Sequence, residues 1–499
     1  MKRNSMRNLS CERRRKVLLI TPPYHCGVVE SAGTWMPLSF VYLGGAARAA
    51  GYDVEIYDAM SKFHAWPEIT KHIEESKPDV IATGAITATI NDCIRIFEIA
   101  KLLDPGVVTV VGGVHSNFQW REVIENNGAV DYVVRGEGEL TFPELLDCHF
   151  AGGNLNDVQG IAYRLDKQAV ATESRPFLAS LSGLPMAWDL IEWQDYSYRP
   201  TPGSTLAVVS YARGCVQACS FCSQQLFWKQ TWRSRRPDDF VDELELLRDA
   251  YGVNVAMIAD EAPTTGEKDW HRLLDLLIER DLGVEILLET RVTDICRDEH
   301  IMDRYTAAGI NHIYVGVESG SQDQLDRFNK NIKVAQSKKA LDLINAANII
   351  SETSFVLGMP EDNRESIKET VKLAKYYNPD LAFFLAIAPW PYAKIYPELK
   401  PYIESYDYSL YNLVEPVIKP RAMTRDEVSK ELFNAFKNFY MGKMAQLPKM
   451  TKFKRDYMIA VAKLLATHSY LADQMKGLAT GMPAKAHTML ADLMGEKVG

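Results

Sequence analysis

Residues 213–222 read Arg-Gly-Cys-Val-Gln-Ala-Cys-Ser-Phe-Cys and hold three of the eight cysteines of this 499-residue chain. The three, Cys215, Cys219 and Cys222, are spaced as CxxxCxxC at the end of a predicted strand, 206–215. Three thiolates this close at the exit of a strand can hold three corners of a 4Fe–4S cluster and leave the fourth iron open to a ligand. Structural zinc is the alternative, but it usually takes four ligands, commonly from paired CxxC motifs, and the other cysteines are scattered. The spacing therefore favours an iron–sulfur cluster.

The cysteine loop opens an array in which strands alternate with helices. A helix is predicted over 235–252, with Pro237 near its first turn and Gly252 at its end. The predicted strands are 206–215, 255–261, 284–291, 312–319, 353–360 and 382–390. Six such strands with helices between them predict a partial (β/α)6 TIM-type barrel, with its chemistry on the loops that follow the strands.

Upstream of the barrel the sequence predicts a second α/β unit. Its strands are expected at 16–21, 54–59, 79–86, 107–113 and 131–139, with a helix at 37–52 among the intervening segments. Alternation of this kind predicts a parallel, doubly wound (Rossmann-like) sheet, and such sheets bind ligands at the carboxyl ends of their strands.

The chain as a whole divides into five expected parts. The last of them is mostly helical, because Thr424 and Glu427 form a capping box before a segment with helical apolar spacing. The parts are a basic leader at 1–15, the doubly wound domain at 16–150, a connector at 151–205, the barrel at 206–400 and a helical C-terminal domain at 401–499.

Composition limits the function classes. The chain has 65 acidic and 56 basic residues, a net charge of −9, so a wholesale basic footprint for nucleic acid is absent. Two stretches, 227–236 and 437–455, are basic and carry aromatic residues, but a solvated face or the rim of an anionic cofactor explains them better than a nucleic-acid site. No apolar run is long enough to span a bilayer and no signal peptide is evident, so we expect a cytoplasmic protein.

The cysteine motif, with the aromatic Phe221 before its last cysteine, resembles the radical S-adenosylmethionine (SAM) superfamily. The resemblance implies that the three cysteines ligate a 4Fe–4S cluster, that SAM chelates the fourth iron, and that Phe221 lies near its adenine. The GGE that the superfamily usually carries at the next strand end is replaced by residues 260–263, Asp-Glu-Ala-Pro, which leaves the contact to the SAM amino group open between Asp260 and Glu261. Further expected SAM contacts at strand ends are Arg291, Glu318 and Gly358.

A doubly wound domain before such a barrel resembles the cobalamin-binding class of that superfamily. The resemblance implies a corrinoid at the strand ends, next to Thr87, Gly112, Gly113, Val114, His115, Ser116, Gly136 and Glu137. Residues 147–152 match DxHxxG, which supplies a lower axial histidine in another cobalamin-binding family. Here the motif follows a helical segment instead of the first strand, so we treat the match as chance and expect no protein histidine below the cobalamin.

Segments along nearly the whole chain look like the family of anaerobic magnesium-protoporphyrin IX monomethyl ester oxidative cyclases. These segments are 32–35, 112–115, 135–139, 260–264, 290–294, 326–330 and 389–392. The resemblance implies oxygen-independent formation of the fifth ring of (bacterio)chlorophyll, with water as the oxygen source and a flavodoxin or ferredoxin as reductant. A flat, apolar porphyrin ester needs an aromatic cleft, for which the candidates are Trp228, Trp232, Trp390 and Tyr392.

A cobalamin-dependent radical SAM methyltransferase that acts on an unactivated carbon is the main alternative. It would share the cluster, both cofactors and both domains, so only the cyclase-like segments favour the cyclase. The products distinguish the two, because a methyltransferase also yields S-adenosylhomocysteine.

Overall fold

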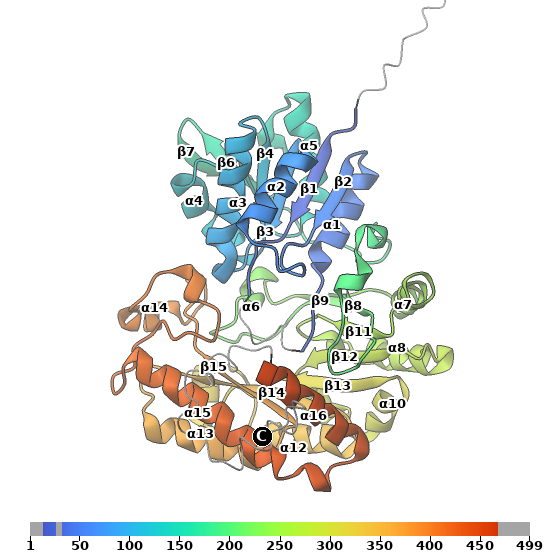
Figure 1. The fold of residues 1–499 in the computed structure, drawn as a ribbon, viewed down its shortest axis with the longest axis vertical. Helices are drawn as coiled ribbons and strands as arrows, with labels where there is room; N and C mark the ends of the chain where they lie inside the picture. Colours follow the sequence, from blue (N-terminus) through green and yellow to red (C-terminus); the bar gives the residue numbers. More distant parts are fainter. Residues whose placement is uncertain (1–12, 26–31, 468–499) are drawn as a thin grey trace, which may run out of the picture.

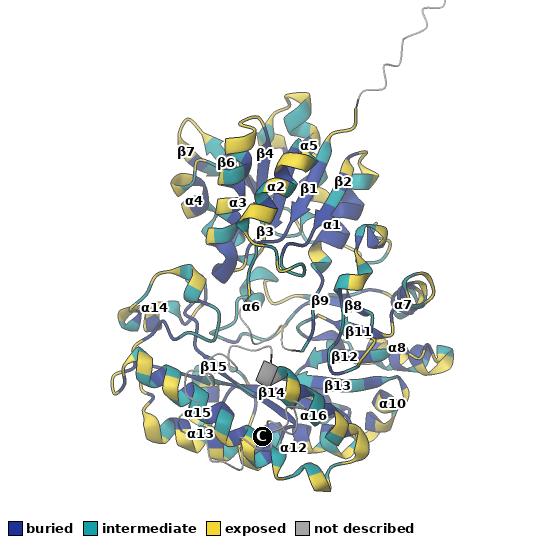
Figure 2. Cartoon of the chain, viewed as in Figure 1, coloured by how far each residue is buried: buried dark blue, intermediate teal, exposed yellow. Residues whose placement is uncertain are grey.

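The computed structural model of the chain describes residues 13–25 and 32–467. An N-terminal α/β unit lies above a larger barrel, and the strands of both units are buried while the outer faces of their helices are exposed (Figures 1 and 2). The fold class predicted from the sequence is therefore confirmed.

The N-terminal sheet has the order β2-β1-β3-β4-β5-β6-β7, and its first five strands are parallel. These five strands are β1 (Lys16–Ile20), β2 (Asp53–Tyr57), β3 (Val80–Gly84), β4 (Val108–Gly112) and β5 (Tyr132–Val134). The helices between and after them are α1 (Leu38–Ala49), α2 (Trp66–Ser76), α3 (Ile90–Leu103), α4 (Val114–Asn126) and α5 (Gly138–Ala151). The strands are short and almost wholly apolar because helices cover both faces of a parallel sheet.

The segment predicted as a connector contributes two strands to this sheet. β6 (Ile161–Leu165) and β7 (Gln168–Ala171) form an antiparallel hairpin next to β5. The hairpin extends the sheet on the side away from β1, after which the chain continues to the barrel.

The barrel is an open, wholly parallel sheet with the order β15-β14-β13-β12-β11-β8. Its strands are β8 (Leu206–Val209), β11 (Val255–Ile258), β12 (Glu285–Thr290), β13 (Ile310–Val315), β14 (Ile350–Leu357) and β15 (Leu381–Ala386). The helices of the barrel are α7 (Pro237–Tyr251), α8 (Glu267–Arg280), α9 (Val292–Arg297), α10 (Met302–Ala307), α11 (Gln322–Arg327), α12 (Val334–Ala346) and α13 (Arg364–Tyr377). All six predicted strands are present.

The predicted strand 206–215 is wrong as one element, because the chain bends after β8. The Asp260 carboxylate accepts hydrogen bonds from the backbone N–H groups of Tyr211 and Ala212, at 2.7 and 2.6 Å. These bonds turn the chain out of the barrel sheet into β9 (Ala212–Gly214), which pairs antiparallel with β10 (Trp232–Ser234). The cysteine loop therefore leaves from a hairpin beside the barrel.

The predicted capping box is confirmed at the start of α15 (Arg425–Met444), where Thr424 and Glu427 bond each other's backbone N–H groups. This helix packs on the edge strand β15, with Phe436 and Phe439 against the ring of Phe384 at centroid distances of 5.5 and 6.1 Å. It is followed by α16 (Lys452–Thr467), also against the barrel. Within the described residues no helix is long and apolar enough to cross a membrane.

Candidate functional site

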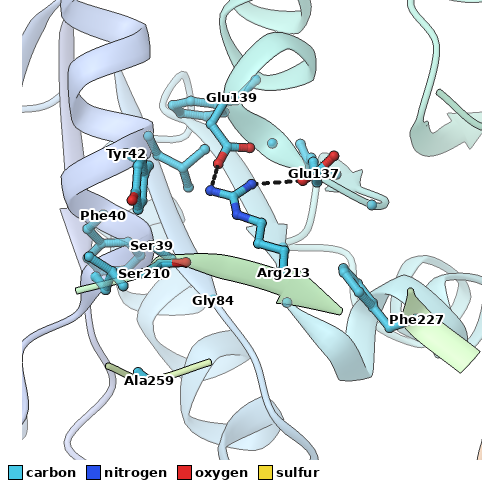
Figure 3. A pocket seen from close by; sticks show the side chains of 18 of the residues that line it. Ser39, Phe40, Tyr42, Gly84, Glu137, Glu139, Ser210, Arg213, Phe227 and Ala259 are labelled. Carbon is cyan, nitrogen blue, oxygen red and sulfur yellow. Dashed lines mark hydrogen bonds and ion pairs between the residues drawn. The ribbon is translucent and has the colours of Figure 1, made fainter. Parts of the chain in front are cut away.

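The carboxyl ends of the two sheets face each other across a cavity of about 320 Å³, which we call the interdomain cavity. Its upper wall includes Gly84, Gly112 and Gly136, which follow or end β3, β4 and β5. Its lower wall includes Ala259 and Asp260, directly after β11 (Figure 3). The edge at which a doubly wound sheet binds ligands is thus the edge that meets the barrel.

Bare glycine backbone forms much of the upper wall. A Cβ atom built on Gly84 or Gly136 would meet no atom within 4 Å, and one on Gly112 would meet only the Val134 carbonyl, at 3.9 Å. Gly113 has a φ of +90°, and a Cβ there would lie 2.5 Å from the carbonyl oxygen of Ala85. These glycines give a flat ligand close access to the backbone, which fits a corrinoid.

Buried ion pairs tie the two units together beside this cavity. Arg213 of β9 donates to Glu137 at 2.8 Å and to Glu139 at 2.5 Å, and Arg233 of β10 reaches Glu137 at 3.0 Å (Figure 3). Burial alone would raise the pKa of Glu137, but both arginines and the N–H of Leu178 outweigh it and lower that pKa. Both Glu137 oxygens are therefore occupied by protein donors.

The other residues expected around the corrinoid do not line the interdomain cavity, and two of them contact Tyr392 from the barrel side. His115 is buried, with Nδ1 3.2 Å from the Thr87 hydroxyl, and that hydroxyl bonds the Tyr392 hydroxyl at 2.8 Å. Burial lowers the pKa of His115 to about 4, so the ring is neutral. Ser116 donates to the Gly112 carbonyl, and Val114 begins α4.

The DxHxxG match lies far from this wall. His149 is in the last turn of α5, where its Nδ1 is 2.8 Å from the Tyr132 hydroxyl, and Asp147 accepts from Tyr52. Because α5 starts at the carboxyl edge of the sheet, its last turn lies toward the opposite edge. This position agrees with a chance match.

The cysteine loop is held by contacts to the segments after α11 and before α14 (Tyr396–Leu399). The Ser220 N–H donates to the Phe328 carbonyl at 2.8 Å, the Ser220 carbonyl accepts from Ile395 at 3.0 Å, and the Asn329 amide donates to the Ala218 carbonyl at 3.0 Å. Cys215, Cys219 and Cys222 are all free thiols. Burial raises the pKa of Cys222 to about 12 and also raises that of Cys219.

No three His, Cys, Asp or Glu side chains converge on one point within the described chain, as the ligands of a single metal ion would. A 4Fe–4S cluster does not require such convergence, because each cysteine binds a different iron. Three free thiols on one anchored loop therefore fit the cluster in number and in chemistry.

The residues expected to contact SAM fall into two groups. Asp260 and Glu261 border the interdomain cavity, and burial raises the pKa of Asp260 to about 7. Glu318 pairs with Lys330 at 2.7 Å, and the Lys330 ammonium lies 5.9 Å from the centre of the Phe221 ring, so these two lie close to the cysteine loop.

Arg291 and Gly358 stand apart from both groups. Arg291 is paired with Asp294 at 2.6 Å, and the Gly358 N–H donates to Asp362 at 2.9 Å. Neither of the two borders the interdomain cavity.

The four aromatic candidates are not brought into one cleft. Trp228 borders the interdomain cavity, whereas the Trp232 indole N–H donates to the Ala262 carbonyl. Trp390 packs against a separate apolar cluster beside the barrel, and Tyr392 stacks on Phe118 at 4.9 Å.

A second cavity, of about 370 Å³, lies inside the barrel, and we call it the barrel cavity. Its walls are mainly apolar, but Glu289, His312, Tyr314 and Glu352 also line it. None of these four residues was predicted from the sequence as part of a site. The available signal was a charged side chain within otherwise apolar strands, as in 284–291.

Comparison with known proteins agrees with both domains. Residues 24–146 match the B12 binding domain, and residues 209–374 match the radical SAM superfamily. The chain is 37% identical to the anaerobic magnesium-protoporphyrin IX monomethyl ester cyclase of Rubrivivax gelatinosus, over 90% of this chain and 82% of that protein. It is 28% identical to an uncharacterised methyltransferase of Pyrococcus horikoshii, over 85% of this chain and 92% of that protein.

A solved structure has the same fold across both domains. It is the cobalamin-dependent SAM radical enzyme OxsB, with aqua-cobalamin and SAM bound. The TM-score is 0.69 at 17% identity, covering 96% of this chain and 75% of that one. The chain therefore belongs to the family of cobalamin-binding radical SAM enzymes that includes the anaerobic magnesium-protoporphyrin IX monomethyl ester cyclases.

Proposed function

We propose that this enzyme is an oxygen-independent oxidative cyclase that forms the fifth ring of (bacterio)chlorophyll from magnesium-protoporphyrin IX monomethyl ester. The observation that carries the proposal is the 37% identity to a cyclase, which extends over 90% of the chain. Water supplies the oxo group. We further propose that the protein is cytoplasmic and that a flavodoxin or ferredoxin reduces it.

Cys215, Cys219 and Cys222 hold the 4Fe–4S cluster in this proposal. Phe221 and Glu318 contact the nucleoside part of SAM, and the SAM amino group meets Asp260 or Glu261. Arg291 and Gly358, at the ends of their strands, also contact SAM in this proposal. When bound, the cluster and SAM supply a 5′-deoxyadenosyl radical that removes a hydrogen atom from the ester side chain, and cobalamin accepts an electron.

The corrinoid lies on the glycine wall formed by Gly112, Gly113 and Gly136. Val114 begins α4 directly after this wall, and Ser116 supports the wall through its hydrogen bond to the Gly112 carbonyl. Thr87 and His115 lie beside it, against Tyr392. We propose that Glu137 fixes the adjoining wall through Arg213, because its oxygens already accept hydrogen bonds from the protein. We propose that no protein histidine lies below the corrinoid, since His115 is buried with its Nδ1 against the Thr87 hydroxyl.

The reacting edge of the porphyrin enters the barrel cavity, whose apolar walls suit an esterified macrocycle. Trp228 borders the interdomain cavity and would contact the part of the substrate that lies nearest the corrinoid. Trp232, Trp390 and Tyr392 shape the rim through their packing.

The test uses anaerobically reconstituted protein with cobalamin, reductant, SAM and the magnesium-porphyrin ester, followed by mass spectrometry of the products. We expect deoxyadenosine together with the mass change of oxo-group insertion and ring closure, and neither product from Cys219→Ala. Formation of deoxyadenosine without conversion of the porphyrin would refute the assignment of this porphyrin ester as the substrate. An intact cluster without cleavage of SAM would refute the radical chemistry.

A methyltransferase is the second candidate, favoured by the 28% identity to a methyltransferase over 85% of the chain. The same experiment tests it. A gain of one methyl group in the porphyrin together with S-adenosylhomocysteine would replace the cyclase assignment.

A further inference from the structure

Polar side chains from three neighbouring barrel strands lie side by side in the barrel cavity. The strand register places Glu289 of β12 opposite Tyr314 of β13, and Tyr314 opposite Glu352 of β14. All three side chains line the cavity, since they share one face of the parallel sheet. The remaining walls are mostly apolar and include Phe383 and Leu385 of β15.

Almost every polar group around this cavity has a partner. Glu352 lies 2.8 Å from His312 Nε2, and His312 Nδ1 lies 2.9 Å from the Tyr198 hydroxyl. The Tyr314 hydroxyl bonds the Ser354 hydroxyl at 2.6 Å. These contacts hold the side chains of Glu352, His312 and Tyr314 in place along one wall of the cavity.

Glu289 is the exception. Across the described residues no hydrogen bond or ion pair reaches its carboxylate, although its side chain borders a mainly apolar cavity. Glu289 is partly buried and faces this cavity, where an unpaired carboxylate is costly, so its neutral form is favoured. Burial first, and then the carboxylates of Glu352, Glu261, Asp260 and Glu318, raise the pKa of Glu289 to about 7.

The charged and titratable groups around Glu289 explain why its ionised form is disfavoured. Its neighbours on β13 are His312 and Tyr314. Glu318, beyond the end of that strand, pairs with the Lys330 ammonium at 2.7 Å. Asp260 and Glu261 follow β11, and Glu352 is the carboxylate on β14. No cation of the described chain pairs with Glu289 itself. An acid of this kind can take up or release a proton near neutral pH at little cost.

We propose that Glu289 is the proton acceptor for the water molecule that adds to the porphyrin side chain inside the barrel cavity. This inference rests on the proposed function. In that reaction the side-chain carbon has lost a hydrogen atom to the deoxyadenosyl radical and an electron to a corrinoid or iron–sulfur acceptor. The water oxygen then forms the new C–O bond, one water O–H bond breaks, and the proton passes to a carboxylate oxygen of Glu289.

Glu289 suits this task better than the other carboxylates. It lies near the carboxyl end of β12, toward the cysteine loop, and borders the cavity that Ala259 links to the interdomain cavity. Glu352 is held by His312, Glu318 by Lys330, and Asp260 by two backbone N–H groups.

The experiment uses the reconstituted enzyme and compares Glu289→Gln and Glu289→Asp with the control Glu285→Gln, which removes a carboxylate from the same strand outside the barrel cavity. Deoxyadenosine, oxygenated porphyrin and incorporation of ¹⁸O from labelled water are measured between pH 6 and 8.5. In the wild type, oxygenated product should form faster as the pH rises through about 7, because the base must be deprotonated. Glu289→Gln should lower the rate at which oxygenated product forms by about 10²-fold or more, and this rate should no longer depend on pH near 7. Glu289→Asp should restore part of both the rate and the pH dependence, and Glu285→Gln should keep the wild-type rate and pH profile.

A second measurement needs no turnover. Infrared difference spectra of the wild-type protein should show protonated carboxyl bands from Glu289 and Asp260 that disappear as the pH is raised through about 7, and Glu289→Gln should lack one of them. Oxygenated product from Glu289→Gln at the wild-type rate, or an unchanged pH profile, would overturn the proposal. Loss of deoxyadenosine along with product would also overturn it, since Glu289 would then act before water adds.

Failure of the wild-type protein to convert the porphyrin is a separate result. It would refute the proposed function and with it this role of Glu289. Conversion by the wild type, with Glu289→Gln unaffected, would refute only the inference.

Discussion

Gly113 shows how one residue sets the shape of the corrinoid wall. Its φ of +90° lies in a region that residues with a Cβ rarely occupy, and it lets the chain pass from β4 into α4. The Ala85 backbone occupies the space of a side chain and is itself held, with its N–H bonded to Gly112 and its carbonyl to His115. Neither side of this contact can move without breaking a hydrogen bond.

Substitution of Gly113 by alanine should therefore destabilise the protein by more than the cost of placing alanine at a positive φ. Gly51 is the matched control, because its φ is +99° and a Cβ there meets no atom within 4 Å. Both substitutions place a residue with a Cβ at positive φ, which costs about 1–3 kcal/mol. Gly113→Ala adds a backbone clash, so we expect it to lower the free energy of unfolding by at least about 1 kcal/mol more. Urea unfolding followed by circular dichroism measures the difference, and equal losses would contradict the assigned close approach.

At the scale of elements, the sequence predicted the strands and their order of alternation because each is a short apolar run between turn residues. Pro237 lies in the first turn of α7 and Gly252 ends that helix, as the sequence predicted. The break between β8 and β9 was not predictable, because its cause is the Asp260 carboxylate, about fifty residues downstream. Local pattern cannot report a partner that distant in sequence.

The residues of the site likewise divide into those that a local pattern reveals and those whose partners are distant in sequence. The cysteine spacing and the glycines after strands are local patterns and were recognised, although their binding roles are still proposals. The partners of Glu137 are Arg213 and Arg233, on a hairpin that meets the N-terminal sheet only in three dimensions. Glu289 was missed because the sequence does not show which face of a strand points into a barrel.

The hairpin formed by β9 and β10 should hold the two units together chiefly through Arg213. Arg213→Met removes the cation that Glu139 contacts and leaves that buried carboxylate unpaired. Loss of one partner of a buried pair costs about 3–5 kcal/mol. The control is Arg48→Met, since Arg48 pairs with Asp189 with side chains that are 38% and 56% exposed and should contribute at most about 1 kcal/mol. Urea unfolding compares the two, and similar small losses would show that the buried network does not stabilise the interface.

For the whole molecule, the important relation is between its two cavities. The interdomain cavity lies between the carboxyl ends of both sheets, the barrel cavity lies within one of them, and Ala259 borders both. Its backbone is fixed, because its N–H donates to the Val209 carbonyl at 3.0 Å, while its small side chain leaves the space beside it open. In the proposed reaction a corrinoid in one cavity must act on a substrate in the other, so this residue lies where the two meet.

A larger side chain at position 259 should separate the cavities without removing either. We expect Ala259→Leu to keep corrinoid binding, seen in the absorbance spectrum of the reconstituted protein, and to lower conversion of the porphyrin ester at least about tenfold, because displacements near 1 Å at a reacting centre cost about a hundredfold in rate. Ala335→Leu on the exposed face of α12 adds the same volume away from both cavities and should convert substrate at the wild-type rate. If Ala259→Leu binds the corrinoid and also converts substrate normally, the cofactor and substrate do not meet at this residue, and the substrate must approach the corrinoid by another side of the barrel.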